Sequence, residues 1–433
     1  MQHSIEPERF GPQGDAMAHQ VKTCVHCGFC LPVCPTYNLT GSEAASPRGR
    51  IDMMVAVADG VLEPEDIVEP LDLCLGCRAC ETACPAGVAF GRLLEAGRVA
   101  AGAGQPASRL GGRLQRLFMA HLLPFPHRLH RLASLLHVYQ ISGVQALVRL
   151  SGLLPRLAPR LAVMEALLPV VPPARARQSL PVETPAHGAE RGRVLLLTGC
   201  VTPQVLPQVN RATVRVLARN GYRVLVTPAQ PCCGALQAHA NDLESARRLA
   251  RHHIAAFEAS AADWLVVNAA GCGAVMKDYG HLLADDPDFA ARAEAFDARV
   301  RDVSELLAAA PLQGPLHPVP LRVAYDDPCH LSHGQRIRQQ PRELLRQVPG
   351  LELLEVPESD WCCGSAGTFN LFHPETADSL LDRKMTHLAS LRPDVVVSGN
   401  PGCLLQLRQG AARHGLSAEI LHPIEMLDRA YRT

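Results

Sequence analysis

Long apolar runs, aromatic side chains and an excess of either charge are scarce or absent in this sequence. No apolar run approaches the ~18 residues that a membrane-spanning helix needs, so we expect no ordinary transmembrane segment. The 42 Lys and Arg residues balance the 42 Asp and Glu residues, which disfavours a general polyanion binder. Aromatic residues are only 4% of the chain, too few to favour nucleic-acid binding. Residues 1–14 hold acidic residues and prolines without an apolar segment, so we expect no secretory signal and a cytoplasmic protein.

The glycine pattern G-x-G-x-x-G of dinucleotide-binding folds is missing as well. Gly271-Cys-Gly273 and Gly102-Ala-Gly104 both lack the third glycine. We therefore expect no flavin on this chain, and a hydride-accepting cofactor would have to come from a partner.

Cysteine, by contrast, is abundant and is arranged in groups. All 16 cysteines fall into groups of four: eight between Cys24 and Cys84, four between Cys200 and Cys272, and four between Cys329 and Cys403. Disulfide scaffolds of this density belong to short secreted chains, whereas this chain has 433 residues and no signal. Ligation of metals or clusters is therefore the better interpretation.

The first eight cysteines form two copies of the spacing C-x2-C-x2-C-x3-C, each followed by proline. In two-cluster ferredoxins of this spacing the fourth cysteine ligates the other cluster. The spacing therefore predicts two [4Fe–4S] clusters, and a pair of structural zinc sites is the weaker alternative. The first cluster is assigned to Cys24, Cys27, Cys30 and Cys84, and the second to Cys74, Cys77, Cys80 and Cys34.

The segment Ser46-Pro47-Arg48-Gly49-Arg50-Ile51 lies between the two motifs. Its simpler interpretation is a helix start, with Ser46 as the N-cap and Pro47 in the first turn. Arg48 or Arg50 could in addition lie near a cluster and raise its potential. We expect the helix start, and the two roles are compatible.

Residues from about 191 onward read as two copies of one unit. Apolar strand-like runs at 193–200, 222–227 and 264–268 alternate with helical stretches at 208–220 and 242–260. The second copy repeats this with runs at 321–325, 351–356 and 394–397 and helical stretches at 336–347 and 375–391. This alternation predicts βαβ units and a parallel sheet in each copy.

In each copy one cysteine follows the first strand, a Cys-Cys-Gly unit follows the second, and one cysteine follows the third. Ligands of parallel sheets lie beyond the carboxyl ends of the strands, so four sulfurs should converge in each copy. These candidate ligands are Cys200, Cys232, Cys233 and Cys272, and then Cys329, Cys362, Cys363 and Cys403. A further cluster, a tetrahedral zinc and reduced thiols without metal all remain open.

The segment between these regions is rich in arginine. Residues 106–180 contain ten Arg, no Lys and one acidic residue, Glu165. Prolines divide the segment into short helices, and leucines recur at helical spacing, as at Leu110, Leu114 and Leu117 and again at Leu129, Leu132 and Leu136. Such a stretch can lie on an anionic membrane surface, dock a partner, or simply pack as a helical linker.

The fold class is therefore an α+β multidomain chain. We expect an α-helical ferredoxin-type domain with two [4Fe–4S] motifs at 1–105 and an Arg-rich helical linker at 106–190. Two repeated α/β Cys-Cys-Gly domains with parallel sheets should follow at 191–315 and 316–433.

These motifs together resemble the iron–sulfur subunit of glycolate oxidase, a glycolate dehydrogenase, over nearly the whole chain. Stretches such as Val25-His-Cys-Gly-Phe-Cys30 and Cys362-Cys-Gly-Ser-Ala-Gly-Thr368 add to the resemblance. The same architecture occurs in the small subunit of anaerobic glycerol-3-phosphate dehydrogenase and in heterodisulfide reductase subunits.

The resemblance implies an electron-transfer subunit that is not catalytic alone. A flavin-containing partner, holding FAD, would oxidise glycolate to glyoxylate, and electrons would pass towards a quinone, with the complex peripheral on the inner face of the plasma membrane. The alternatives are a subunit of a glycerol-3-phosphate or lactate dehydrogenase, a thiol or disulfide reductase, and a redox sensor. The heterodisulfide reductase motif ends C-x2-C, whereas Val275 and Gln406 stand here, which argues against its non-cubane cluster and disulfide chemistry.

Overall fold

The N-terminal region is a compact group of helices. The computed structural model describes residues 14–102 and 117–432. Helix α1 packs against α6, and Val21, Met54, Leu71 and Leu93 form the centre of their shared core. The region contains α1 (Gly14–Thr23), α2 (Pro35–Thr40), α3 (Pro47–Ala58), α4 (Val68–Asp72), α5 (Ala79–Ala83) and α6 (Phe90–Ala100). The short helices leave the cysteine loops between them.

The arginine-rich linker forms short helices, as the prolines predict. These are α8 (Pro126–Ile141), α9 (Val144–Ser151), α10 (Leu153–Leu157) and α11 (Pro159–Ala166). Pro126 and Pro159 each stand in the first turn, where proline's missing N–H costs no hydrogen bond. Leu129 of α8 is buried, whereas Leu110 and Leu114 lie outside the described residues.

Two parallel sheets follow, and they confirm the predicted α/β repeat. The first, with order β1-β3-β2-β4-β5, contains β1 (Glu183–Thr184), β2 (Gly192–Leu197), β3 (Tyr222–Leu225), β4 (Trp264–Val267) and β5 (Val300–Asp302). The second, with order β7-β6-β8-β9, contains β6 (Arg322–Asp326), β7 (Glu352–Leu354), β8 (Val395–Ser398) and β9 (Glu419–Leu421). Only the pairing of β1 with β3 is antiparallel among the described strands. We call the two units the first and second modules.

Helices cover both sheets and join the modules. The first module holds α12 (Thr202–Val205), α13 (Pro207–Arg219), α14 (Ala235–His239), α15 (Leu243–Ser260), α16 (Ala270–Met276), α17 (Tyr279–Leu282), α18 (Ala290–Asp297) and α19 (Val303–Ala308). The second holds α20 (Gln339–Arg346), α21 (Phe369–Phe372), α22 (Pro374–Leu391), α23 (Pro401–Arg413) and α24 (Pro423–Arg432). Helix α24 packs against α13, where Arg215 and Asp428 form an ion pair of 2.7 Å. Val194 and Val323, one from each sheet, belong to one continuous core.

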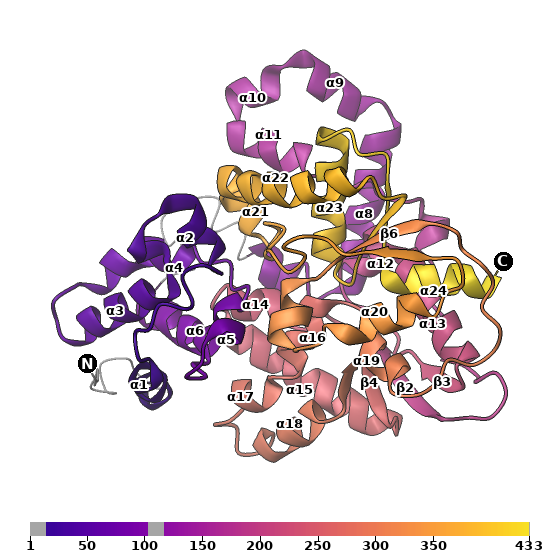
Figure 1. Cartoon of the computed structure of the whole chain (residues 1–433), viewed down its shortest axis with the longest axis horizontal. Helices are drawn as coiled ribbons and strands as arrows, with labels where there is room; N and C mark the ends of the chain where they lie inside the picture. The colour runs from indigo at the N-terminus through magenta and orange to yellow at the C-terminus, as the bar shows by residue number, and fades with distance from the viewer. Residues whose placement is uncertain (1–13, 103–116, 433) are drawn as a thin grey trace.

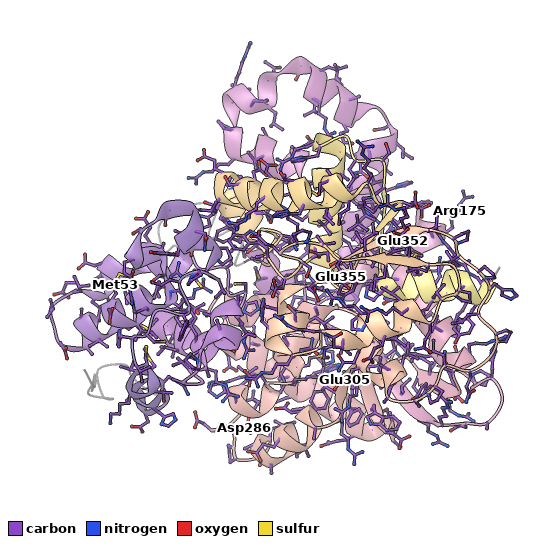
Figure 2. The ribbon with its side chains drawn as sticks, in the orientation of Figure 1. Met53, Arg175, Asp286, Glu305, Glu352 and Glu355 are labelled. Carbon is purple, nitrogen blue, oxygen red and sulfur yellow. The ribbon has the colours of Figure 1, made fainter. Side chains whose placement is uncertain are left out.

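The three regions meet at the centre of the molecule. The N-terminal helices lie at the left of Figure 1 beside α14, and α9 to α11 project at the top beyond α22 and α23. Figure 2 shows Met53 in the N-terminal region, Asp286 at the lower edge of the first module and Glu355 in the second.

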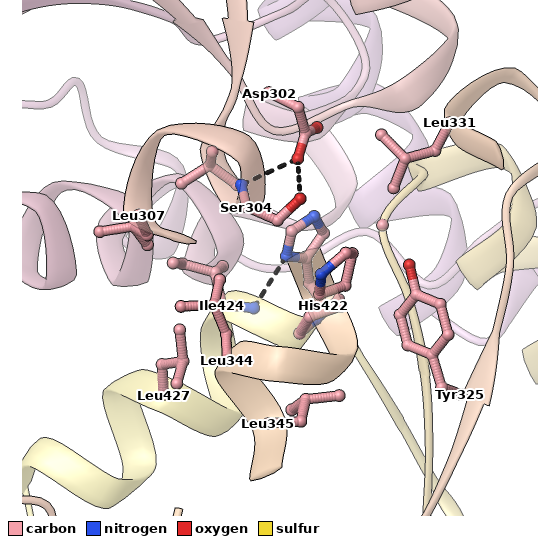
Figure 3. Close-up of a pocket in the computed structure, with 14 residues that line it drawn as sticks. Asp302, Ser304, Leu307, Tyr325, Leu331, Leu344, Leu345, His422, Ile424 and Leu427 are labelled. Atoms are coloured by element: carbon pink, nitrogen blue, oxygen red, sulfur yellow. Dashed lines mark hydrogen bonds between the residues drawn. The ribbon is translucent and has the colours of Figure 1, made fainter. Parts of the chain in front are cut away.

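Figure 3 shows a small cavity between the modules, where Asp302 accepts hydrogen bonds from Ser304. The walls are mainly aliphatic side chains of both modules, among them Leu307, Leu344 and Ile424. Since residues of both modules line it, the cavity is part of the interface between them.

Candidate metal centres

The first cysteine loop follows α1 and lies near the surface. Burial raises the pKa of the Cys24 thiol, and the nearby charges of Cys84 and Cys27 add to the rise. Cys84, from the second motif, therefore lies beside the first loop. Cys27 is exposed, and the flanking Val25 and Phe29 are each 63% exposed.

The second set of cysteines surrounds a cavity in the interior of the N-terminal region. Cys34 from the first motif lines it together with Cys74, Cys77 and Cys80 from the second. Burial raises the pKa of Cys77 and of Cys80 well above the usual thiol value. The crossed arrangement of the two motifs thus brings together the residues that the spacing rule grouped.

Arg50 supplies an independent test of whether an anionic cluster fits this cavity. Its side chain is completely buried and lines the cavity. Nε donates to the Pro70 carbonyl at 2.8 Å and Nη2 to the Thr36 hydroxyl at 3.2 Å. Nη1 has no hydrogen-bond partner in the described part of the chain. A buried guanidinium needs an acceptor, and a cluster of sulfides and thiolates would provide one, so the residues fit a [4Fe–4S] group.

The segment that carries Arg50 starts a helix as predicted. Ser46 is the N-cap of α3, and its hydroxyl accepts from the Gly49 N–H at 2.9 Å. Arg48 instead reaches the first loop, where its Nη1 donates to the His26 carbonyl at 3.3 Å. The helix start therefore directs one arginine towards each cysteine loop.

The first module gathers its four cysteines where β2, β3 and β4 end. The Sγ atoms of Cys200 and Cys232 are 3.7 Å apart. Hydrogen bonds from Cys200 and Cys233 hold the pKa of Cys232 well below its usual value. The same bonding raises the pKa of Cys233, as does its bond with Cys272. The sheet therefore brings these four side chains into one interacting group.

The second module gathers its set in the same way. The Sγ atoms of Cys363 and Cys403 are 3.3 Å apart, and Nδ2 of Asn400 lies 3.5 Å from Cys403 Sγ. The pKa of Cys362 is raised, and the largest cause is its hydrogen bond with Cys329. No disulfide links any of the sixteen cysteines.

The glycine of each Cys-Cys-Gly unit has a conformational reason. Gly234 and Gly364 adopt φ values of +87° and +84°, in the left-handed region that side chains disfavour. At Gly364 a Cβ atom would lie 2.5 Å from the Ala377 carbonyl oxygen. The Gly234 backbone N–H approaches Cys232 Sγ at 3.5 Å, so the turn also aims a donor at sulfur.

The surroundings of the two sets differ in charge. In the second module the buried Lys384 forms an ion pair with Asp326 and donates to the Ser359 carbonyl at 2.9 Å. Burial alone would lower the pKa of Lys384, but the Asp326 carboxylate raises it, so a cation stands near the sulfurs. The first module has His253 beside Cys232, and burial lowers the pKa of this imidazole to about 4. The second set therefore lies near a buried ion pair, whereas the first lies near an imidazole.

The second cysteine set of the N-terminal region abuts the set of the second module. After burial, the charge of Cys362 is the largest influence on the raised pKa of Cys77, and both side chains belong to one apolar cluster with Trp361. His330, next to Cys329, lies 2.9 Å from the Gly76 carbonyl oxygen through Nε2. The contact of His330 with Gly76 joins residues 254 positions apart. No pattern in the sequence predicts such contacts, so His330 and Lys384 were not among the predicted site residues.

The thiol groups do not converge on single points. Across residues 14–102 and 117–432, no three His, Cys, Asp or Glu side chains are placed to hold one metal ion. A cluster places each thiolate on a different iron atom, so it does not require such convergence.

Comparison with known protein families accounts for each region. Residues 20–88 match the 4Fe-4S dicluster domain, and residues 194–277 and 323–408 match the cysteine-rich domain. Residues 111–168 match the linker region of the glycolate oxidase iron-sulfur subunit. The probable glycolate oxidase iron-sulfur subunit of Bacillus subtilis is 42% identical, with coverage of 93% of this chain and 91% of the relative.

This chain belongs to the family of glycolate oxidase iron–sulfur subunits. The Escherichia coli member is 35% identical, with coverage of 95% of this chain and 94% of the relative. The resemblance drawn from the motifs is thereby confirmed, and the chain is a component of an oxidoreductase complex.

One solved structure shares the fold across nearly the whole chain. A hypothetical protein from Helicobacter pylori aligns with a TM-score of 0.53 at 8% identity. The alignment covers 98% of this chain and 73% of that one. It supports the order of regions described above.

Proposed function

We propose that the chain holds two [4Fe–4S] clusters and relays single electrons between a flavin-containing partner and a quinone. Cys24, Cys27, Cys30 and Cys84 would hold the first cluster, and Cys34, Cys74, Cys77 and Cys80 the second. When bound, the clusters supply one-electron redox chemistry. The observation that carries the proposal is the buried cavity that cysteines of both motifs line together with Arg50.

The proposed reaction balances with this chain as an intermediary. Oxidation of glycolate to glyoxylate releases two electrons and two protons. A flavin on the partner takes up the pair of electrons and releases them singly, and a quinone takes two electrons and two protons. The chain therefore needs no proton site of its own, only redox centres in sequence. A membrane quinone would place the complex at the inner face of the plasma membrane.

Exposure gives the relay a direction. The loop of Cys27 is at the surface between the exposed side chains of Val25 and Phe29, which suits electron exchange with a partner. Cys77 is buried against Cys362 of the second module. The surface loop is therefore the proposed site of exchange with the flavoprotein, and the inner set faces the cysteine-rich modules.

The cysteine sets of the modules are proposed to bind metal centres as well. Four thiol side chains interact at the strand ends of each module, and the buried ion pair of Lys384 and Asp326 lies beside the second set. Buried thiols with raised pKa values gain from ligation, because a metal stabilises the thiolate form. Quantification of iron and zinc distinguishes the possible metal contents. About eight irons per chain indicates the two cubane clusters alone, and additional iron or zinc indicates further centres.

The test uses the complex with its flavoprotein partner. Cys27→Ser and Cys77→Ser should each abolish glycolate-dependent quinone reduction, while glycolate still bleaches the partner's flavin. Val61→Ser, at an exposed position of the same region, is the matched control and should change neither reading. Quinone reduction that persists in both cysteine variants would refute the relay.

A further inference from the structure

Helices α9, α10 and α11 form a lobe that has no core of its own. None of their residues is buried, and they project away from the modules in Figure 1. We call residues 144–166 the apolar lobe. Helices without buried residues gain little stability from packing against one another, so we expect another surface to bury their apolar side chains.

Exposed apolar side chains concentrate on and beside this lobe. Nineteen large apolar side chains are exposed in the described chain, and ten of them fall within residues 135–170. Leu150 and Leu157 are 86% and 81% exposed, the two highest values among these leucines. Those of the lobe itself are Val144, Leu147, Leu150, Leu153, Leu157 and Leu161. Their spacing of three and four residues keeps them on one side of the short helices.

The charge of the lobe is positive. It contains Arg149, Arg156 and Arg160, and its one acidic residue is Glu165. The Glu165 side chain is only 12% exposed and is held by Arg149 at 3.0 Å and by Gln145 at 2.8 Å. The two remaining arginines have no ion pair among the described residues. Apolar side chains beside uncompensated arginines match an anionic lipid surface.

The composition favours lipid over a protein partner. Buried centres of protein interfaces are enriched in aromatic residues, and leucine is under-represented among their energetic hot spots. Residues 141–170 contain no Phe, Tyr or Trp and are dominated by leucine. No helix in the described chain is long and apolar enough to cross a bilayer, so contact would be confined to the interface.

We propose that the apolar lobe is an interfacial anchor that inserts its leucines into an anionic phospholipid membrane surface, with Arg156 and Arg160 facing the headgroups. The inference names the surface by which the proposed quinone-linked complex would meet its membrane. It rests on exposure and charge, which are independent of the cysteine sites.

The test measures binding of the purified full-length chain to vesicles by co-sedimentation. Vesicles of phosphatidylcholine with phosphatidylglycerol are compared with vesicles of phosphatidylcholine alone. The chain should bind the anionic vesicles, and the double variant Leu150→Glu, Leu157→Glu should lower the partition coefficient more than tenfold, because each change places a charge in apolar surroundings. Arg156→Gln with Arg160→Gln should lower it by about fivefold per residue, and only on anionic vesicles.

Controls separate the lobe from general effects. Val61→Glu with Val182→Glu changes two apolar side chains that are 76% and 62% exposed elsewhere, and should leave vesicle binding unchanged. Iron content and dithionite reduction should be the same in all variants, so failure of the electron relay is read separately. All four lobe substitutions are at exposed positions, so the fold should be retained.

Two outcomes would overturn the proposal. The first is a wild-type chain that does not bind anionic vesicles, or one whose binding the leucine variant leaves intact. The second is a wild-type chain that does not bind vesicles but binds the flavoprotein partner or forms a concentration-dependent dimer, where the leucine variant loses that partner or that dimer. In that case the lobe is a protein-docking surface.

Discussion

Arg50 offers the sharpest test of the inner cluster site. Its guanidinium is completely buried, lines the cavity of four cysteines, and leaves Nη1 without a partner in the described chain. A bound cluster carries negative charge, and the reduced form carries one charge more. A positive donor therefore stabilises the reduced form more than the oxidised form and raises the potential. Arg50→Gln should lower the potential of the second cluster.

The size of the shift follows from hydrogen-bond energies. A hydrogen bond to a charged group contributes about 1.5–3 kcal/mol. If about half of that energy stabilises only the reduced form, the hydrogen bond favours the reduced cluster over the oxidised cluster by about 1 kcal/mol. For one electron, 59 mV corresponds to a tenfold change in equilibrium constant, or about 1.4 kcal/mol, so the expected fall is roughly 40 mV.

The assay is a redox titration followed by electron paramagnetic resonance, which separates the two clusters. Arg50→Lys keeps the charge and should give a smaller fall, whereas Arg48→Gln should shift the first cluster instead, because Arg48 reaches the His26 carbonyl. Unchanged iron content shows that the site is intact. An unchanged potential in Arg50→Gln with full iron content would refute the assignment of Nη1 to the cluster.

Two further predictions concern stability. Gly364→Ala should destabilise the chain more than Gly234→Ala. Both substitutions cost about 1–2 kcal/mol because of the positive φ, and only the new Cβ at position 364 overlaps a backbone carbonyl, which adds about 1–3 kcal/mol. Urea unfolding measures the two free energies of unfolding, and the reverse order would contradict this explanation. Burial raises the pKa of Asp302 to about 6, so the native state binds more protons than the unfolded state between about pH 4 and pH 6. The contribution of Asp302 to stability therefore falls as pH rises through that window, by up to about 3 kcal/mol. Asp302→Asn should therefore flatten the pH dependence of Tm between about pH 4 and pH 6, whereas the control Asp288→Asn should leave it unchanged. Equal slopes of Tm against pH in both variants would contradict the role given to the Asp302 carboxylate.

The sequence predicted local elements closely where a short-range cause exists. Helix α15 begins at Leu243, one residue from the predicted start, because Asp242 caps it by accepting from the Ser245 N–H. The antiparallel strand β1 was not predicted, since two residues at a sheet edge carry no periodic pattern. Its pairing with β3 depends on tertiary contact.

The candidate sites were predicted in part for the same reason. Cysteine spacing and strand order indicated which sulfurs lie together, because both are local rules. The approach of His330 to Gly76 and the orphaned Nη1 of Arg50 depend on how whole regions dock. Ligation by the cysteine sets and the boundaries of the four predicted regions stay predictions, which the iron measurements and variants above address.

The packing of α24 on α13 makes the two repeats one cooperative body. The last helix of the second copy covers a helix of the first, and Arg215 and Asp428 tie them together. Loss of α24 would therefore expose α13 of the first module, which lies far from Pro423 in the sequence. The two modules therefore depend on each other for stability, and we expect neither to fold stably when it is expressed alone.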